Sequence, residues 1–125
     1  MKFPLICFLF FGLTLTSIAQ QNATPSFEQW ISLKQAGGVQ VSPDGKHLVY
    51  TVTSTNWSAN NYDTEVWLSR DGGKPFQLTQ TQNGSSNAAA FSPDSKWISF
   101  LADRGNKTQL FLVAAEGGEA FAITN

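Results

Sequence analysis

An internal repeat restricts the fold of this 125-residue chain more strongly than any other feature of its sequence. Residues 41–50 (VSPDGKHLVY) return fifty positions later as residues 91–100 (FSPDSKWISF). The later part of the repeat returns at a slightly shorter spacing: EVWL (65–68), GG (72–73) and LT (78–79) correspond to QLFL (109–112), GG (117–118) and IT (123–124). Periods of about 20 to 50 residues are typical of solenoids, propellers and arrays. The chain is therefore predicted to contain two copies of one supersecondary unit.

Each copy divides into four short segments with strand character. Pro43 and Pro93 fix φ near −65° at a first turn position, and Gly45 supplies a positive φ without strain. Four antiparallel strands in about 45 to 50 residues match one blade of a β-propeller. The predicted fold is all-β, with two four-stranded antiparallel blades of an incomplete β-propeller. In the second copy we expect the strands at residues 87–91, 96–102, 109–114 and 120–124.

The apolar pattern indicates that both faces of each blade are covered. One face of the second strand carries an alternating apolar set that recurs in the second copy: Leu48, Tyr50, Val52 and then Ile98, Phe100, Ala102. The opposite face, with Val49, Trp97 and Leu101, is also partly apolar. Blades that stack face to face need two such faces. We place the first blade at residues 39–80 and the second at residues 81–125.

A short helix is predicted ahead of the first blade, within the N-terminal segment 20–38. Ser26 and Gln29 have the spacing of a capping box. The helix is expected to cover residues 27–36 and to stop at the Gly-Gly pair 37–38. We expect it to pack on the sheet through an apolar stripe made of Phe27, Trp30 and Ile31.

The first nineteen residues have the pattern of a cleaved signal peptide. Lys2 precedes an apolar run at 3–15, and small residues occupy positions 17 and 19, before Gln20. The alternative is an uncleaved membrane anchor, but a span needs about 20 apolar residues. The protein is therefore expected to be exported, to the periplasm or the extracellular space, with no membrane attachment after cleavage. Its only cysteine, Cys7, would leave with the signal.

Composition excludes several classes of function. The chain has 8 Lys and Arg against 9 Asp and Glu, one His and one Cys, and only 14% of its residues are charged. These counts argue against a basic nucleic-acid-binding protein, a disulfide scaffold and a Cys/His metal cluster. No nucleic-acid partner, cofactor or metal is expected.

No catalytic set of residues is predicted. His47 follows the first Pro-Asp-Gly turn at a strand position, where the second copy has Trp97, and is interpreted as a strand residue. Asp44 and Asp94 suggest paired carboxylates for a metal or for acid–base chemistry. Because they recur with the repeat, we interpret each as a residue that stabilises its own turn. Other acidic residues are expected to be solvated in or beside turns: Asp103, Glu116 and Glu119.

The first copy contains an insertion of about six residues within 53–64. Trp57 and Tyr62 lie there among polar residues. Aromatic side chains with a polar tip suit interfaces, so they could contact a partner domain or a ligand. The alternative is that they fold back on their own hairpin, and the sequence leaves both open.

Taken together, these motifs resemble the start of the prolyl oligopeptidase family of serine peptidases, in its acylaminoacyl-peptidase and dipeptidyl-peptidase branch. The resemblance rests on the helix before the first blade, on QVSPDGK (40–46), on a long hairpin that ends in VWL (66–68), and on DGG (71–73) with QLT (77–79). It covers the sequence after the signal. The Ser-Pro-Asp-Gly repeat itself also occurs in the periplasmic propeller of the Tol system.

The resemblance implies an N-terminal propeller, commonly of seven or eight blades, and a C-terminal α/β-hydrolase domain that carries the Ser, Asp and His triad. The propeller would restrict entry to short peptides. The 125 residues contain two repeats, and they contain no G-x-S-x-G nucleophile elbow. We therefore expect a truncated chain whose partners are the remaining blades and the hydrolase domain. The alternative is a non-enzymatic, Tol-system-like propeller that binds other proteins.

Overall fold

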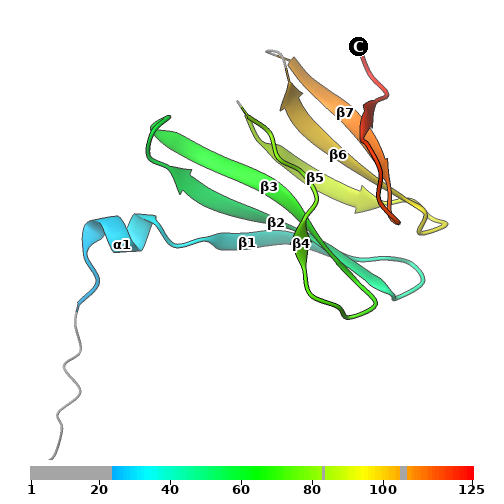
Figure 1. Cartoon of the computed structure of the whole chain (residues 1–125), viewed down its shortest axis with the longest axis horizontal. Coiled ribbons are helices and arrows are strands. Elements are labelled where there is room, and N and C mark those ends of the chain that lie inside the picture. Colours follow the sequence, from blue (N-terminus) through cyan, green and yellow to red (C-terminus); the bar gives the residue numbers. More distant parts are fainter. Residues whose placement is uncertain (1–23, 83, 105–106) are drawn as a thin grey trace, which may run out of the picture.

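The computed structural model describes residues 24–82, 84–104 and 107–125. The predicted signal peptide, residues 1–19, lies outside them. Two twisted sheets stand side by side, and a short helix precedes the first of them (Figure 1). Among the described residues, no helix has the length and apolar character needed to cross a bilayer.

Each copy of the repeat forms one antiparallel sheet of four strands. In the first sheet the strands are β1 (Gln35–Val41), β2 (His47–Asn56), β3 (Asn61–Arg70) and β4 (Phe76–Gln77). In the second they are β5 (Ser86–Phe91), β6 (Trp97–Arg104), β7 (Lys107–Ala114) and β8 (Phe121–Ala122). Both sheets have their strands in sequence order, each paired with the next. The prediction of an all-β chain with two blades is confirmed, although β8 is shorter than the predicted 120–124.

The two copies use the same turn after their first strand. The Ser42 hydroxyl donates to Asp44 Oδ1 at 2.5 Å and accepts from the His47 backbone N–H at 2.9 Å. The second copy repeats these contacts at 2.6 and 2.9 Å, with Ser92, Asp94 and Trp97 as the three residues. The predicted turn role of both aspartates is confirmed.

The blades end in a second repeated contact. The hydroxyl of Thr79 accepts from the Val66 backbone N–H at 2.9 Å, and the hydroxyl of Thr124 accepts from the Leu110 N–H at the same distance. The short fourth strand is thus supported by a side-chain bond just beyond its end. This explains why the Leu-Thr and Ile-Thr pairs recur in the sequence.

The hydrophobic core lies between the two blades. The first blade contributes Val49, Val66 and Leu68, all fully buried. Strand β5 packs against β1, β2 and β3, and the second blade adds a larger apolar set: Ala89, Ile98, Phe100, Ala102, Phe111, Val113 and Ala115. The rings of Phe100 and Phe111 stack with their centroids 5.7 Å apart. The blades therefore stabilise each other by facing one another.

The helix α1 (Phe27–Ile31) is shorter than predicted. Its capping box is present, because the Ser26 hydroxyl accepts from the Gln29 N–H and the Gln29 side chain accepts from the Ser26 N–H. The predicted extension to residue 36 is wrong, because β1 already begins at Gln35, where it pairs with Thr53. Backbone pairing along β2 outweighs the intrinsic helix preference of residues 33–36, which is roughly tenths of a kcal/mol per residue.

The Gly-Gly pair 37–38 therefore does not stop a helix. It lies inside β1, where the register of the ladder shifts between Gly37 and Gln40. Gly38 has φ of 58°, which favours glycine. The Thr51 hydroxyl donates to the Gly37 carbonyl at 3.0 Å across this irregular region. The pair marks a bulge in the strand.

The prediction that the helix packs on the sheet is also wrong. Phe27 and Trp30 are 72% and 65% exposed, and none of the helix residues is buried. Ile31 alone is half-buried, and its carbonyl accepts from the Thr55 hydroxyl. A helix of five residues is too short to turn a full apolar stripe toward the sheet. Its aromatic side chains remain at the surface.

Candidate functional site

The insertion in the first copy lengthens the β2–β3 hairpin. The two strands stay in register from His47–Arg70 to Asn56–Asn61. At the tip, the Asn56 side-chain carbonyl accepts from the Ser58 hydroxyl at 2.8 Å and from the Ala59 N–H at 3.1 Å. Asn60 has φ of 50°, a conformation that asparagine tolerates. The tip is therefore an ordered turn with its own hydrogen bonds.

Trp57 and Tyr62 are exposed at this tip, by 55% and 61%. More than half of each side chain thus stays in contact with solvent, and the sequence alternatives of a partner contact and of folding back on the hairpin both remain predictions. With Thr55 and Ile31 they line a groove of about 130 Å³. Helix α1 lies beside the same end of the hairpin (Figure 1). We call this surface, made of Ile31, Trp57 and Tyr62, the aromatic end.

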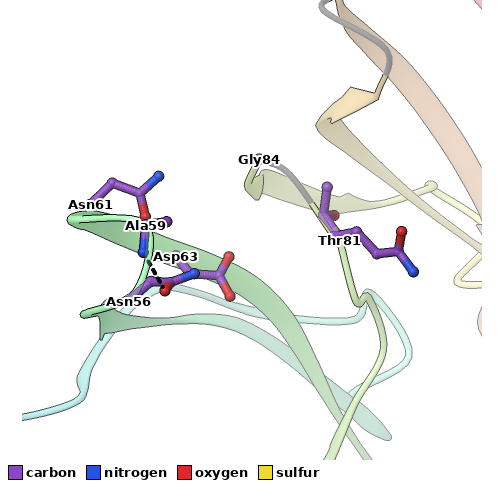
Figure 2. A pocket seen from close by; sticks show the side chains of 7 residues that line it. Asn56, Ala59, Asn61, Asp63, Thr81 and Gly84 are labelled. Atoms are coloured by element: carbon purple, nitrogen blue, oxygen red, sulfur yellow. Dashed lines mark hydrogen bonds between the residues drawn. The ribbon is translucent and has the colours of Figure 1, made fainter.

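A polar cavity of about 290 Å³ lies behind the hairpin tip (Figure 2). It separates the tip from the segment that leads into the second blade. In Figure 2 the Asp63 carboxylate points away from the tip toward this segment. The residues that line the cavity are Asn56, Ala59, Asn61, Asp63, Thr81, Gln82 and Gly84.

Two carboxylates on β3 differ sharply in their surroundings. Glu65 is 5% exposed, accepts from the Thr81 backbone N–H at 2.5 Å, and accepts from the Thr79 hydroxyl. Asp63 has one buried oxygen, Oδ1, without any hydrogen-bond partner. Burial, and then the negative charge of Glu65, raise the pKa of Asp63. Sequence reasoning missed both residues, although their alternate positions on one strand placed them on one face.

A second, more open cavity of about 410 Å³ lies at the opposite end, between the two repeated turns. The Ser95 hydroxyl joins these turns by accepting from the Asp44 N–H at 3.1 Å. His47 is 7% exposed, and its ring stacks on Phe91 with centroids 6.4 Å apart. The other lining residues are Asp94, Lys96, Trp97, Ala114 and Glu116.

The turn carboxylates are held in their ionised form. Hydrogen bonds from the Ser42 hydroxyl and then from the Lys46 N–H lower the pKa of Asp44. The equivalent donors, Ser92 and Lys96, lower the pKa of Asp94. An aspartate used in this way is poorly suited to general acid–base catalysis, which needs a pKa near the working pH.

His47 is not arranged as a catalytic base. Ser42 bonds to the backbone N–H of His47 and to Asp44, and the ring nitrogen Nδ1 has no hydrogen-bond partner. A serine nucleophile needs its hydroxyl bonded to such a ring. Asp103 accepts from the Thr108 hydroxyl at 2.5 Å within its own hairpin, and Glu116 and Glu119 are exposed. Within the described residues, no group of three His, Cys, Asp or Glu side chains could hold a metal.

Two sheets of this form, stacked face to face, are propeller-type blades. Comparison with known proteins shows which proteins the chain is similar to. No protein-family model matches the sequence. The uncharacterized peptidase YuxL of Bacillus subtilis is 30% identical over 89 residues, which are 69% of this chain and 13% of that protein. Dipeptidyl-peptidase 5 of Porphyromonas gingivalis is 31% identical over 91 residues, 72% of this chain and 13% of that protein.

The fold also matches a solved structure. An acylaminoacyl peptidase of Pyrococcus horikoshii superposes with a TM-score of 0.60 at 18% identity, over 77% of this chain and 14% of that one. Peptidase relatives and this shared fold confirm the predicted resemblance: the chain is related to the propeller part of the prolyl oligopeptidase family. It spans about one-eighth of the length of the relatives it matches.

Proposed function

We propose that this chain is the N-terminal propeller part of an exported serine peptidase that acts on short peptides. Its role there would be to filter substrates by size and to hold the domains together, while the hydrolase domain does the chemistry. The observation that carries this proposal is the agreement between peptidase relatives and the two-blade fold. The 125 residues contribute no nucleophile elbow of their own.

The outer faces of the blades support a place inside a larger ring. Tyr50 and Trp67 stack at 6.5 Å on the face of the first blade that points away from the second. On the far face of the second blade, Trp97 is 37% exposed and forms an edge contact with Phe121. Further blades stacked on these faces would bury them, as the two blades already bury each other.

The aromatic end supports the scaffold role. Large exposed aromatic side chains that gather at one place mark interaction surfaces. Trp57 and Tyr62 belong to a hydrogen-bonded hairpin tip and so would meet a partner with little loss of backbone freedom. We assign this surface to contact with the hydrolase domain of the complete protein.

Export is part of the same proposal. The lysine, apolar run and small residues of positions 1–19 have the order of a secretory signal. Mass spectrometry of the exported protein should then give Gln20 as its first residue. An intact Met1 in a membrane fraction would contradict cleavage.

The function is tested with the complete product of the gene. We expect it to hydrolyse acyl-peptide or dipeptidyl nitroanilides and to cleave short peptides in preference to long ones. Trp57→Ala with Tyr62→Ala should weaken the docking of the two domains and relax this length preference, whereas the exposed-residue change Glu119→Gln should not. A reading frame that ends after four to six more repeats, without G-x-S-x-G, would support the Tol-system-like binding propeller instead.

A further inference from the structure

Each blade has one face that the other blade covers and one face that it leaves free. The register of the strands assigns five side chains to the free face of the first blade: Val41, Leu48, Tyr50, Val52 and Trp67. It assigns five more to the free face of the second blade: Trp97, Leu101, Leu110, Leu112 and Phe121. All ten are half-buried or exposed. The two-blade stack therefore ends in an apolar face on either side.

The free face of the first blade is of a type that the molecule already buries elsewhere. Tyr50 and Trp67 correspond in the repeat to Phe100 and Phe111. The rings of Phe100 and Phe111 are buried in the core between the blades, where they cover the first blade. The same face of the repeat is thus covered in the second blade and uncovered in the first.

The free face of the second blade is of the opposite type. Leu110 and Leu112 correspond to Val66 and Leu68 of the first blade, which are fully buried against the second blade. The existing contact between the blades therefore joins one face of each type. The two free faces are again one of each type, so a single chain presents both halves of the contact that it already forms internally.

The two free faces can meet without leaving a charge unpaired. All ten side chains named on them are uncharged, and the rings of Trp97 and Phe121 already form an edge contact at 6.1 Å on one of the faces. Exposed apolar side chains that gather on one surface mark sites of association. Because the two faces differ, association through them is head-to-tail and continues until a ring closes.

We propose that the partner of these faces is a second copy of this chain. The free face of the first blade of one copy stacks on the free face of the second blade of the next, as the two blades of one copy already stack on each other. Closed propellers have about four to eight blades, so about two to four copies cover every face. The inference goes beyond the proposed function and does not depend on peptidase activity.

The test measures the mass of residues 20–125 in solution by size-exclusion chromatography with light scattering. This span contains every residue that the structure describes and omits the apolar run 3–15, whose own association would confuse the result. The mass should rise with concentration to a limit of about two to four copies. A single copy up to about 100 μM, well above a micromolar Kd, would reserve the faces for blades of a longer polypeptide and overturn the proposal.

A charge placed on either free face should block this assembly. Phe121→Glu changes the free face of the second blade, and Val41→Glu changes that of the first. Each should weaken association at least about tenfold, because the contact would bury an unpaired charge. Phe27→Glu is the matched control, since it replaces an exposed phenylalanine of helix α1, outside both faces, and should leave association within about twofold. An equal loss with Phe27→Glu would indicate non-specific apolar association and overturn the proposal.

A mixture of the two face variants tests the head-to-tail arrangement. Phe121→Glu keeps the free face of the first blade intact and Val41→Glu keeps that of the second, so the mixture can form one contact and no more. Each variant alone should remain a single copy, and the mixture should form a pair that does not grow with concentration. A mixture that stays at single copies, or that grows beyond pairs, would contradict the proposal.

Far-ultraviolet circular dichroism should show that the variants fold. Trp97→Glu, on the same face as Phe121, replaces Phe121→Glu if that variant does not fold. Peptide hydrolysis by the complete gene product is measured separately, and its absence would leave these masses unchanged. The two proposals therefore fail independently.

Discussion

The two blades carry the same alternating pattern but bury opposite faces. In the second blade the buried face holds Ile98, Phe100 and Ala102. The residues at equivalent positions of the first blade are Leu48, Tyr50 and Val52, and all are only half-buried. The first blade instead buries Val49, Val66 and Leu68, and its own Tyr50–Trp67 stack is the half-exposed counterpart of Phe100–Phe111.

This difference follows from stacking. Each blade turns toward its neighbour the face that the neighbour can cover, so the two buried faces come from opposite sides of the repeat. An apolar set in a propeller sequence thus predicts which residues can be buried, and the position of the blade decides which of them are. Substitutions at equivalent positions of the two blades measure this difference in burial directly.

The largest difference in stability loss is expected between variants of the two stacked ring pairs. Phe100→Ala should lower the free energy of unfolding by roughly 3–5 kcal/mol, because it leaves a cavity between the blades. Tyr50→Ala should cost about 1–2 kcal/mol, since a half-exposed ring loses less burial. Urea unfolding followed by circular dichroism gives both values. Equal losses would show that the two faces are covered alike.

A smaller difference in stability loss is expected between the alanine variants of Glu65 and of its counterpart Gln109. Glu65→Ala would leave the Thr81 N–H and the Thr79 hydroxyl without their acceptor, at a cost of roughly 1–3 kcal/mol. The Gln109 side chain donates to the exposed Thr124 carbonyl, so Gln109→Ala should cost less than about 0.5 kcal/mol. Thermal unfolding of the two variants makes the comparison. A larger loss for Gln109→Ala would mean that the segment between the blades is not held by Glu65.

The repeated turns differ at one position with positive φ. Gly45 has φ of 75°, and the equivalent Ser95 has φ of 61°. Gly45→Ala should destabilise the protein by about 1–2 kcal/mol, the cost of a left-handed conformation with a side chain. Ser95→Gly should change stability little, because relief of that strain offsets the lost bond to the Asp44 N–H. A marked loss for Ser95→Gly in the same unfolding assay would make the bond between turns the dominant contribution.

The smallest expected effect concerns two aspartates with opposite pKa shifts. The pKa of Asp94 is lowered by the Ser92 hydroxyl, so its stabilisation is present above the ordinary aspartate pKa and is lost as the pH falls. The pKa of Asp63 is raised by burial and by Glu65, so the folded state binds more protons, and stability falls as the pH rises above the ordinary value.

Unfolding of Asp63→Asn and Asp94→Asn from about pH 2 to pH 7 measures these opposite slopes. Relative to the unchanged protein, Asp63→Asn should gain stability as the pH rises, and Asp94→Asn should lose it. Slopes of the same sign in the two variants would contradict the assigned surroundings of one of the carboxylates.

The sequence predicted the fold through features that are local and repeated. The Ser-Pro-Asp turn fixes its own hydrogen bonds, and the alternation of Ile98 and Phe100 places both side chains on one face whatever lies beyond. The length of the helix was not predictable in this way, because residues 35–38 join β1 only when β2 is present to pair with them. The pairing partner of Gln35 is Thr53, which lies beyond the first turn, outside the segment whose helix pattern was considered, and it decided the outcome.

The candidate site depended on distant residues as well. Trp57 and Tyr62 were recognised from their polar surroundings, but their exposure follows from where the hairpin tip lies relative to the rest of the blade. Asp63 gave no signal in the sequence, since its significance comes from a cavity closed by Thr81 and Gly84 of another segment. Alternation placed it beside Glu65 but did not indicate which of the two would find donors.

The central proposal is that the chain supplies blades and that the chemistry would reside in a hydrolase domain of a longer protein. A fluorophosphonate probe, which labels activated serines, tests this most directly. The account predicts that residues 20–125 remain unlabelled, while the complete gene product is labelled at a single serine outside them. Stoichiometric labelling of residues 20–125 that His47→Ala abolishes would contradict it.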